Sequence, residues 1–148
     1  GPTDHSGVSI VRSPSAVQYR PGLSGDVVAG LLNDGRAEGV ARVAVAEAQR
    51  RGARLRFVQI VDQDLSPEER ADADQATFRA AVRALRGYRG IPCRFEVVTG
   101  DPTDTLVDLA RSAAALIIGA DDESPRSLAL RVAALASCPV VAVPVQAA

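Results

Sequence analysis

The amino-acid sequence predicts a single α/β domain built on a parallel β-sheet. Its 148 residues suit one domain with one sizeable core. From Asp26 onward, short runs of Val, Ile and Leu alternate with longer segments of helical period, which is typical of βαβ units. Three of the longer segments also begin with a proline that directly follows a capping residue. Together these observations predict five strands and four helices.

The expected elements alternate along the chain. Strands are predicted at residues 27–32, 55–61, 93–99, 115–119 and 140–145, and helices at residues 39–51, 67–87, 102–113 and 125–136. Ser66, Pro67 and Glu69 form a capping-box pattern at the start of the second helix. Asp101-Pro102 and Ser124-Pro125 place a cap followed by proline at the next two helix starts.

Two of the predicted helices carry apolar stripes. We interpret both stripes as core that faces the sheet, because helical apolar spacing usually reflects packing. Their members are Val40, Val43, Ala44 and Ala48 on the first helix, and Phe78, Val82 and Leu85 on the second.

Residues 1–25 differ in composition from the rest and are expected to form an extended N-terminal arm before a domain at residues 26–148. The arm is rich in Gly, Pro and Ser, and residues 8–11 form its one β-favouring run. Gly1-Pro2 is consistent with the remnant of a removed tag.

Charge and composition argue against several classes of function. The 17 basic side chains are all Arg and the acidic side chains number 18, so the chain lacks the basic excess that nucleic-acid binding needs. Without lysine there is neither a Schiff-base nucleophile nor a P-loop lysine, and His5 is the single histidine. No catalytic constellation is visible, so we expect a protein that is not an enzyme.

The cysteines and the hydropathy pattern indicate a cytoplasmic protein. Cys93 and Cys138 match no metal or redox spacing and are interpreted as small apolar residues in a reducing compartment. The sequence has neither a long uncharged apolar run nor a signal-peptide pattern, so direct membrane insertion is not expected.

In an open parallel sheet, ligands bind beyond the carboxyl ends of the strands, where the strand order reverses. The loops expected there, at residues 33–35, 62–64, 100–101 and 119–124, are rich in carboxylates, with Arg36 and Arg126 as nearby cations. An anionic phosphate at this rim would face several like charges. The run Asp121-Asp122-Glu123 lacks the pattern of a calcium-binding loop and is interpreted as a solvated loop, so no metal site is expected.

Three stretches of the chain resemble the universal stress protein family. Residues 46–58, AEAQRRGARLRFV, resemble the family's first helix and second strand. The passage GDP at residues 100–102, followed by AALIIG at residues 114–119, resembles its GDP…ADLIVVG segment. Residues 137–143, SCPVVAV, resemble its last strand. The resemblance covers roughly residues 26–145 and implies a doubly wound, five-stranded parallel sheet of order 3-2-1-4-5 with helices on both faces.

Some family members bind ATP, and the resemblance marks the positions that would contact a ligand here. They use an acidic residue after the first strand, a backbone contact after the second, and a loop of the form G-x2-G-x9-G-[S/T] around the phosphates. The matching positions in this chain are Asn33 or Asp34, Val61, Gly119, Arg126 and Ser127.

The phosphate loop itself departs from the family pattern. Asp122 stands where the second glycine belongs, and Arg126 replaces the glycine before Ser127. Only eight positions separate Gly119 from Ser127, about half of what the full motif requires. The chain therefore resembles the branch of the family that lacks the ATP-binding loop, and no ATP cofactor is expected.

The last predicted strand is expected to join two copies of the chain. It would be an apolar edge strand, which invites pairing with another chain unless it is covered. Family members that form homodimers through this strand support the same expectation. Interface residues would be Val140, Val141, Ala142, Val143 and Val145, with Pro144 limiting the ladder. The alternative is that residues 8–11 of the arm cover this edge within one chain.

Two hypotheses of function remain open. The first is a dimeric regulatory or stress-response module that acts through protein contacts without ATP. It could also be a segment of a longer protein, because such domains occur fused to transporters or kinases in the family that the chain resembles. The second is a sensor that binds an adenine nucleotide or nucleoside at the switch point between the first and fourth strands. A metal-dependent hydrolase at the acidic rim is a weaker third interpretation.

Overall fold

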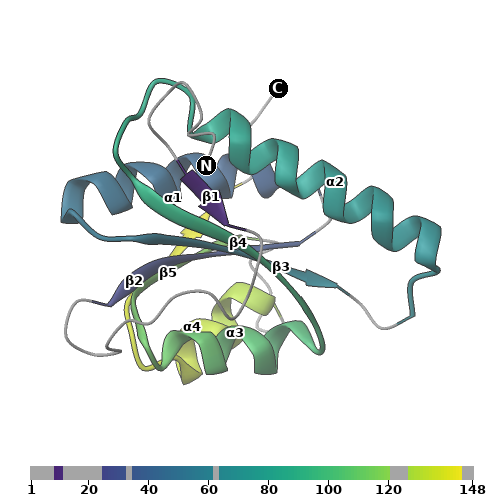
Figure 1. The fold of residues 1–148 in the computed structure, drawn as a ribbon. Helices are drawn as coiled ribbons and strands as arrows, with labels where there is room; N and C mark the ends of the chain where they lie inside the picture. Colours follow the sequence, from purple (N-terminus) through teal and green to yellow (C-terminus); the bar gives the residue numbers. More distant parts are fainter. Residues whose placement is uncertain (1–8, 12–24, 33–34, 62–63, 121–126, 145–148) are drawn as a thin grey trace.

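The computed structural model describes residues 9–11, 25–32, 35–61, 64–120 and 127–144. Its strands are β1 (Ser9–Val11), β2 (Asp26–Leu31), β3 (Leu55–Val61), β4 (Pro92–Thr99), β5 (Ala113–Gly119) and β6 (Val140–Val143). Its helices are α1 (Ala37–Arg51), α2 (Pro67–Ala84), α3 (Pro102–Ala110) and α4 (Leu128–Leu135). Helices α1 and α2 cover one face of the sheet, and α3 and α4 cover the other (Figure 1).

The sheet is parallel throughout and has the order β1-β4-β3-β2-β5-β6. The order of the last five strands is the predicted 3-2-1-4-5, so the doubly wound α/β fold is confirmed. β1 adds a sixth strand that had been expected to be part of an extended arm. It pairs with β4, with Ser9 opposite Pro92 and Val11 opposite Arg94. The alternative in which this run covers the last strand is therefore wrong, because β4 and β6 lie near opposite edges of the sheet.

Two of the three predicted helix starts are confirmed in detail. The Ser66 hydroxyl accepts from the Glu69 backbone N–H at 3.1 Å, and the Glu69 carboxylate accepts from the Ser66 N–H at 2.9 Å. Asp101 caps α3 by accepting from the Asp104 N–H at 3.0 Å. The predicted start of α4 is wrong, as described below. Helices α2 and α3 also end about three residues earlier than expected, at Ala84 and Ala110.

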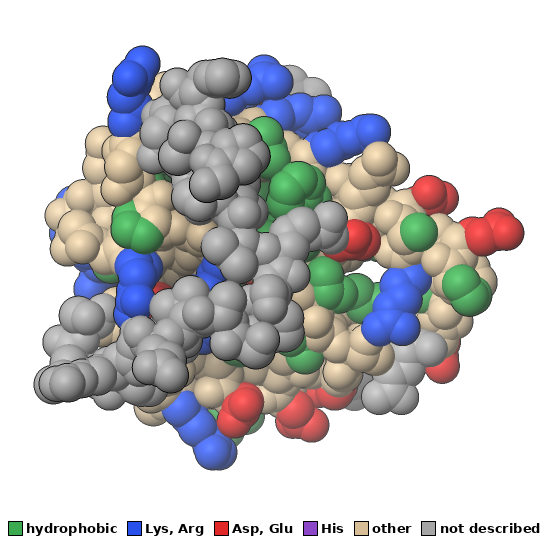
Figure 2. All heavy atoms as spheres, in the orientation of Figure 1, with side chains coloured by type: hydrophobic (Ala, Val, Ile, Leu, Met, Phe, Trp, Pro, Cys, Tyr) green, Lys and Arg blue, Asp and Glu red, His purple; other side chains and the backbone are tan. Residues whose placement is uncertain are grey.

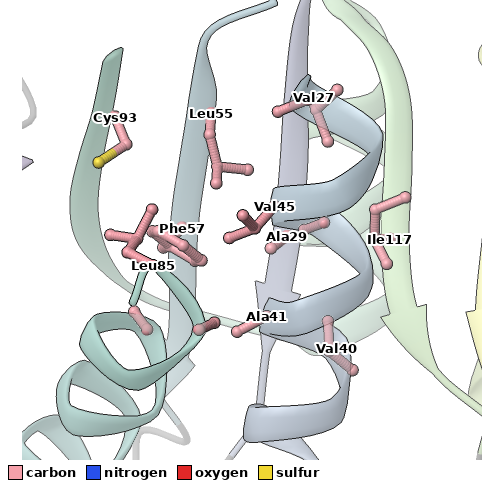
Figure 3. Close-up of a cluster of buried hydrophobic side chains, with 14 of the residues drawn as sticks. Val27, Ala29, Val40, Ala41, Val45, Leu55, Phe57, Leu85, Cys93 and Ile117 are labelled. Atoms are coloured by element: carbon pink, nitrogen blue, oxygen red, sulfur yellow. The ribbon is translucent and has the colours of Figure 1, made fainter. Parts of the chain in front are cut away.

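The larger hydrophobic core lies between the sheet and the α1–α2 layer (Figure 3). Val40, Ala44 and Ala48 of α1 are buried there as predicted. On α2 the stripe is only partly correct, because Val82 is 37% exposed. The buried side of α2, which packs against α1 and β3, consists mainly of alanines: Ala73, Ala80, Ala81 and Ala84. Cys93 and Cys138 are free thiols, so no disulfide links them.

None of the helices in the described part of the chain combines the length and apolar character needed to cross a membrane.

Candidate ligand site

All strands are parallel, so their carboxyl ends meet at one edge of the sheet. β2 lies between β3 and β5, and the chain leaves it toward β3 on one side and returns at β5 on the other. This is the topological switch point at which doubly wound proteins bind ligands. Acidic side chains gather at the end of the molecule where α2 begins, while Arg side chains lie over the carboxyl-terminal half of α2 (Figure 2). Among the predicted site residues, Asn33, Asp34 and Arg126 lie outside the described residues, so the site is built from Val61, Gly119 and Ser127.

Val61 ends β3 with its side chain 2% exposed. Its carbonyl oxygen accepts a hydrogen bond from the Gly100 N–H at 3.2 Å, which ties the end of β3 to the turn after β4. A ligand that used this backbone would therefore share the carbonyl with Gly100. Val61 itself lines a cavity, described below, at the end of β3.

Gly119 ends β5 and lies under the side chain of Arg36. A Cβ atom on Gly119 would stand 3.1 Å from Arg36 Cδ and 3.4 Å from Arg36 Cβ. The space left between β2, α1 and Gly119 is only about 10 Å³, close to the minimum for one water molecule. The aliphatic part of Arg36 thus fills the crevice at the switch point. Arg36 was predicted only as a cation near the site, because its packing over Gly119 depends on contacts between α1 and β5.

Ser127 is the N-cap of α4, which corrects the prediction that Ser124 caps a helix beginning at Pro125. Its hydroxyl accepts from the Leu130 N–H at 3.1 Å, and Ser127 is 2% exposed. The helix begins at Leu128, directly after Ser127. The hydroxyl that the family resemblance assigns to a phosphate is already engaged in holding the helix end.

A cavity of about 190 Å³ lies at the carboxyl end of β3. It is lined by Leu32, Gln59, Ile60, Val61, Leu65, Ala73 and Pro102. Gln59 is fully buried, and its side-chain oxygen and nitrogen have no hydrogen-bond partner among the residues that the structure describes. Gln59 was not among the predicted site residues. The available signal was a polar amide at an inward position of the apolar strand LRFVQIV.

A larger hollow of about 360 Å³ lies between the start of α1 and the end of β6. Its lining residues include Arg36, Glu38, Arg42, Val143 and Pro144. Glu38 accepts from Arg42 at 2.8 Å, so part of the charge in this hollow is paired. It adjoins the end of β6, the strand of the predicted dimer interface.

The predicted interface residues on β6 differ in exposure. β6 pairs with β5 from Leu116–Val140 to Gly119–Val143. Val141 is 38% exposed and Ala142 is exposed, whereas Val140 is half-buried and Val143 is 6% exposed. Val143 therefore belongs to the core, and Val141 and Ala142 are the surface residues of this strand. Val145 lies outside the described residues.

The described part of the chain has no cluster of three or more His, Cys, Asp or Glu side chains that could hold a metal ion. Burial raises the pKa of the Cys138 thiol, which disfavours the thiolate that a nucleophile requires.

The fold defines a doubly wound α/β protein whose switch-point crevice is filled by Arg36 and whose cavity of about 190 Å³ lies at the carboxyl end of β3. The chain belongs to the universal stress protein family, whose model matches residues 26–144. Universal stress proteins are in general not enzymes.

Solved structures of the same family are similar in fold. A universal stress protein from Archaeoglobus fulgidus is 26% identical, covers 80% of this chain and 98% of its own, and superposes with a TM-score of 0.64. A universal stress protein crystallised with cAMP is 21% identical over 84% of this chain and 98% of its own, with a TM-score of 0.65. A family protein from Arabidopsis thaliana with AMP bound is 16% identical over 83% and 93%, with a TM-score of 0.58. The last two likenesses show the fold alone. No curated protein sequence matches the chain.

Proposed function

We propose that the chain is a cytoplasmic regulatory module of the stress-response type that works as a homodimer joined through β6 and does not hold ATP in a glycine loop. The observation that carries this proposal is the outer edge of β6. In the described sheet this edge has no neighbouring strand, and Val141 beside it is 38% exposed. An apolar edge of this kind favours pairing with a second chain.

The narrow crevice at the switch point supports the proposal that the chain does not hold a triphosphate there. Arg36 packs over Gly119, and the space between them and β2 is about 10 Å³. A glycine loop normally lets backbone N–H groups approach the phosphates, and the eight-residue interval to Ser127 leaves little chain for this. Ser127 in turn uses its hydroxyl to cap α4.

Light scattering of the purified chain tests the dimer. We expect a dimer at tens of micromolar that dissociates in Val141→Asp, because a carboxylate at the interface would be buried without a partner. Val82→Asp is the matched control, since Val82 on α2 is 37% exposed on a different surface. A monomeric wild type, or a Val141→Asp variant that stays dimeric, would contradict the proposal.

A second candidate function is the sensing of an adenine nucleotide or nucleoside at the switch point. The cavity of about 190 Å³ at the end of β3, the strand beside β2, favours it, although the crevice between β2 and Gly119 itself is filled by Arg36. Pockets for drug-sized ligands begin at about 300 Å³, so this cavity suits one planar base with the rest of the ligand outside. The related structures with cAMP and with AMP bound support adenine as the base.

A thermal-shift series with ATP, AMP, adenosine and cyclic AMP, with and without Mg²⁺, tests the second function. A ligand at 100 times its Kd adds about 2.7 kcal/mol to the unfolding free energy. For a domain of this size the melting temperature then rises by several degrees. We expect adenosine or a monophosphate to give this shift and Mg·ATP to give a smaller one. No shift with any of these ligands would contradict the sensor function and leave the dimer proposal standing.

A further inference from the structure

Three arginine side chains surround a hollow between α1 and the end of α2, which we call the arginine hollow. Its volume is about 420 Å³, and the described residues that line it are Arg42, Arg83, Ala84, Arg86 and Tyr88. None of them also lines the cavity at the end of β3. Arg side chains are visible over this half of α2 in Figure 2. The arginine hollow is therefore a separate feature of the layer formed by α1 and α2.

Glu38 is the carboxylate that pairs with two of these arginines. Its Oε2 accepts from Arg42 Nη2 at 2.8 Å, and its Oε1 accepts from Arg83 Nη1 at 3.2 Å. One carboxylate thus lies between a guanidinium of α1 and a guanidinium of α2. Arg86 forms no ion pair with any residue that the structure describes. Glu38 balances one of the three positive charges around the hollow, so two remain unbalanced.

The end of α2 does not require these guanidinium groups as caps. Arginines near a helix carboxyl end often bind its last carbonyl groups and stabilise its dipole. Here the Ala81 carbonyl accepts from the Leu85 N–H at 3.2 Å, and the Arg83 carbonyl accepts from the Arg86 N–H at 3.2 Å. The side chains of Arg42 and Arg83 are 64% and 52% exposed. Their guanidinium groups are therefore accessible to a molecule from outside.

A phosphate group matches the charge and the donors of the arginine hollow. A phosphorylated side chain carries close to two negative charges and three strong acceptor oxygens. Arginine binds phosphate through two parallel N–H groups, which makes it a specific partner for this group. The position of Glu38 shows that an oxyanion fits between Arg42 and Arg83. Tyr88 is half-buried in the lining, and its hydroxyl can donate a further hydrogen bond.

The surroundings of the hollow favour a peptide over a small phosphorylated molecule. Small ligands bind in sites that enclose most of their surface, whereas the arginines here are largely exposed. Arg42 also lines the hollow of about 360 Å³ beside Val143 and Pro144, so the two hollows meet at this side chain. An extended chain can place its phosphate in one hollow and an apolar neighbour in the other.

We propose that the arginine hollow docks a phosphorylated segment of a partner protein, with the phosphate bound by Arg42, Arg83 and Arg86. The phosphate displaces Glu38 as the anion between the first two arginines. This inference goes beyond the proposed dimer and the proposed sensor, because the hollow includes neither the edge of β6 nor the cavity at the end of β3.

The first experiment compares two peptides on the full wild-type chain by fluorescence anisotropy. The probe is a short fluorescein-labelled peptide with one phosphoserine among alanine and leucine residues, and its partner is the same peptide with serine. We expect the phosphorylated peptide to bind at least about 10-fold more tightly, because the phosphate adds charge-assisted hydrogen bonds. Equal affinities, or no binding of either peptide, would overturn the proposal.

The second experiment changes the charges around the hollow. Arg86→Ala should weaken the phosphorylated peptide about 10-fold, because it removes a hydrogen-bonding cation. Its melting temperature should stay within about 2 °C of wild type, since Arg86 is exposed and has no ion pair to lose. Glu38→Gln should strengthen binding about 2- to 5-fold, because Arg42 and Arg83 no longer hold a competing carboxylate.

Arg131→Ala is the matched control. Arg131 is exposed on α4, which covers the opposite face of the sheet, so this variant changes the net charge equally but leaves the hollow intact. It should bind the phosphorylated peptide as the wild type does. Weakening equal to that of Arg86→Ala would show attraction by net charge alone and would overturn the proposal, as would unchanged binding in Arg86→Ala.

Competition distinguishes a protein segment from a small anion. Inorganic phosphate and free phosphoserine are expected to displace the labelled probe less effectively than the unlabelled phosphorylated peptide, because they make no contact beyond the phosphate itself. If they compete equally well, the hollow binds a small anion and the docking of a protein segment is overturned. The dimer at β6 is tested separately by light scattering, and none of these outcomes bears on it.

Discussion

Arg56 and Glu96 form a two-bond ion pair across β3 and β4, with Nε to Oε2 at 2.7 Å and Nη2 to Oε1 at 2.9 Å. Arg94 lies directly opposite Arg56 in the register, and its Nε is 3.3 Å from Glu96 Oε2. Glu96 therefore lies between two arginines that would otherwise face each other. All three side chains are at most 12% exposed, so the charges are poorly screened by water.

We predict that Glu96→Gln costs about 3–5 kcal/mol of unfolding free energy, because it leaves buried cationic charge without its counterion. A double-mutant cycle with Arg56→Leu, measured by urea unfolding, should give a coupling of at least about 1 kcal/mol. The exposed pair Arg42–Glu38 is the control, and its coupling should be about 0.3–0.5 kcal/mol. Equal coupling in the two cycles would contradict this account.

The effect of pH on stability that arises from Asp26 should have the opposite sign to that of an aspartate paired at the surface. Burial raises the pKa of Asp26, while Arg54, Arg56 and Arg94 act in the lowering direction. A carboxyl group whose pKa is raised by folding contributes stability at pH values below its unfolded-state pKa. This contribution is lost as the pH rises through the folded-state pKa. Asp26→Asn should therefore gain stability relative to wild type between acid and neutral pH. Unfolding curves at pH 3 to 7 measure the difference, and a difference that falls with pH would rule out this assignment.

Loss of the Ser127 hydroxyl should destabilise the end of α4. We expect Ser127→Ala to lower the unfolding free energy by about 0.5–2 kcal/mol, because the Leu130 N–H then loses its cap. Ser127→Gly should cost only a few tenths of a kcal/mol relative to serine, since glycine is tolerated at an N-cap. Thermal unfolding measures both variants. If the alanine and glycine variants lose the same stability, the cap is not the main role of this residue.

Two glycine-to-alanine changes should have opposite signs. At Gly25 a Cβ would lie 2.7 Å from the Ala114 backbone nitrogen, so the strands must shift and we expect a loss of about 1–3 kcal/mol. At Gly39, in the first turn of α1, the nearest atom is Val143 Cγ1 at 3.8 Å. Gly39→Ala should gain about 0.5–1 kcal/mol from helix propensity. Unfolding in urea compares the two, and a loss at Gly39 would contradict the prediction.

The sequence predicts best those features that neighbouring residues determine. Ser66 and Asp101 each cap a helix through an N–H three residues away, so both caps could be read from a short pattern. The same pattern fails at α4 because Ser124 and Ser127 are both suitable caps. The helix starts after Ser127, where Ala129 and Val132 reach the core on the α3–α4 side of the sheet. The choice between the two serines depends on tertiary packing, which local propensity does not contain.

The candidate site was only partly predictable for the same reason. Val61 and Gly119 could be placed at the carboxyl edge because strand ends follow from the alternation of elements. The packing of Arg36 over Gly119 and the cavity at Gln59 depend on contacts between elements far apart in the chain. The partner of β1 was missed because a three-residue run carries no information about which edge of the sheet it joins.

The short strand β1 also limits how many copies could join edge to edge. It lies at the opposite end of the sheet from β6 and consists of three residues. So short a strand offers little backbone for another chain to extend. When two copies pair through β6, the outer edge on each side of the joined sheet is the short strand β1. A third copy cannot pair well with this edge, so the assembly stops at a closed dimer. A chain that lacked this strand would present the long strand β4 instead, and its pairs could lengthen into fibres.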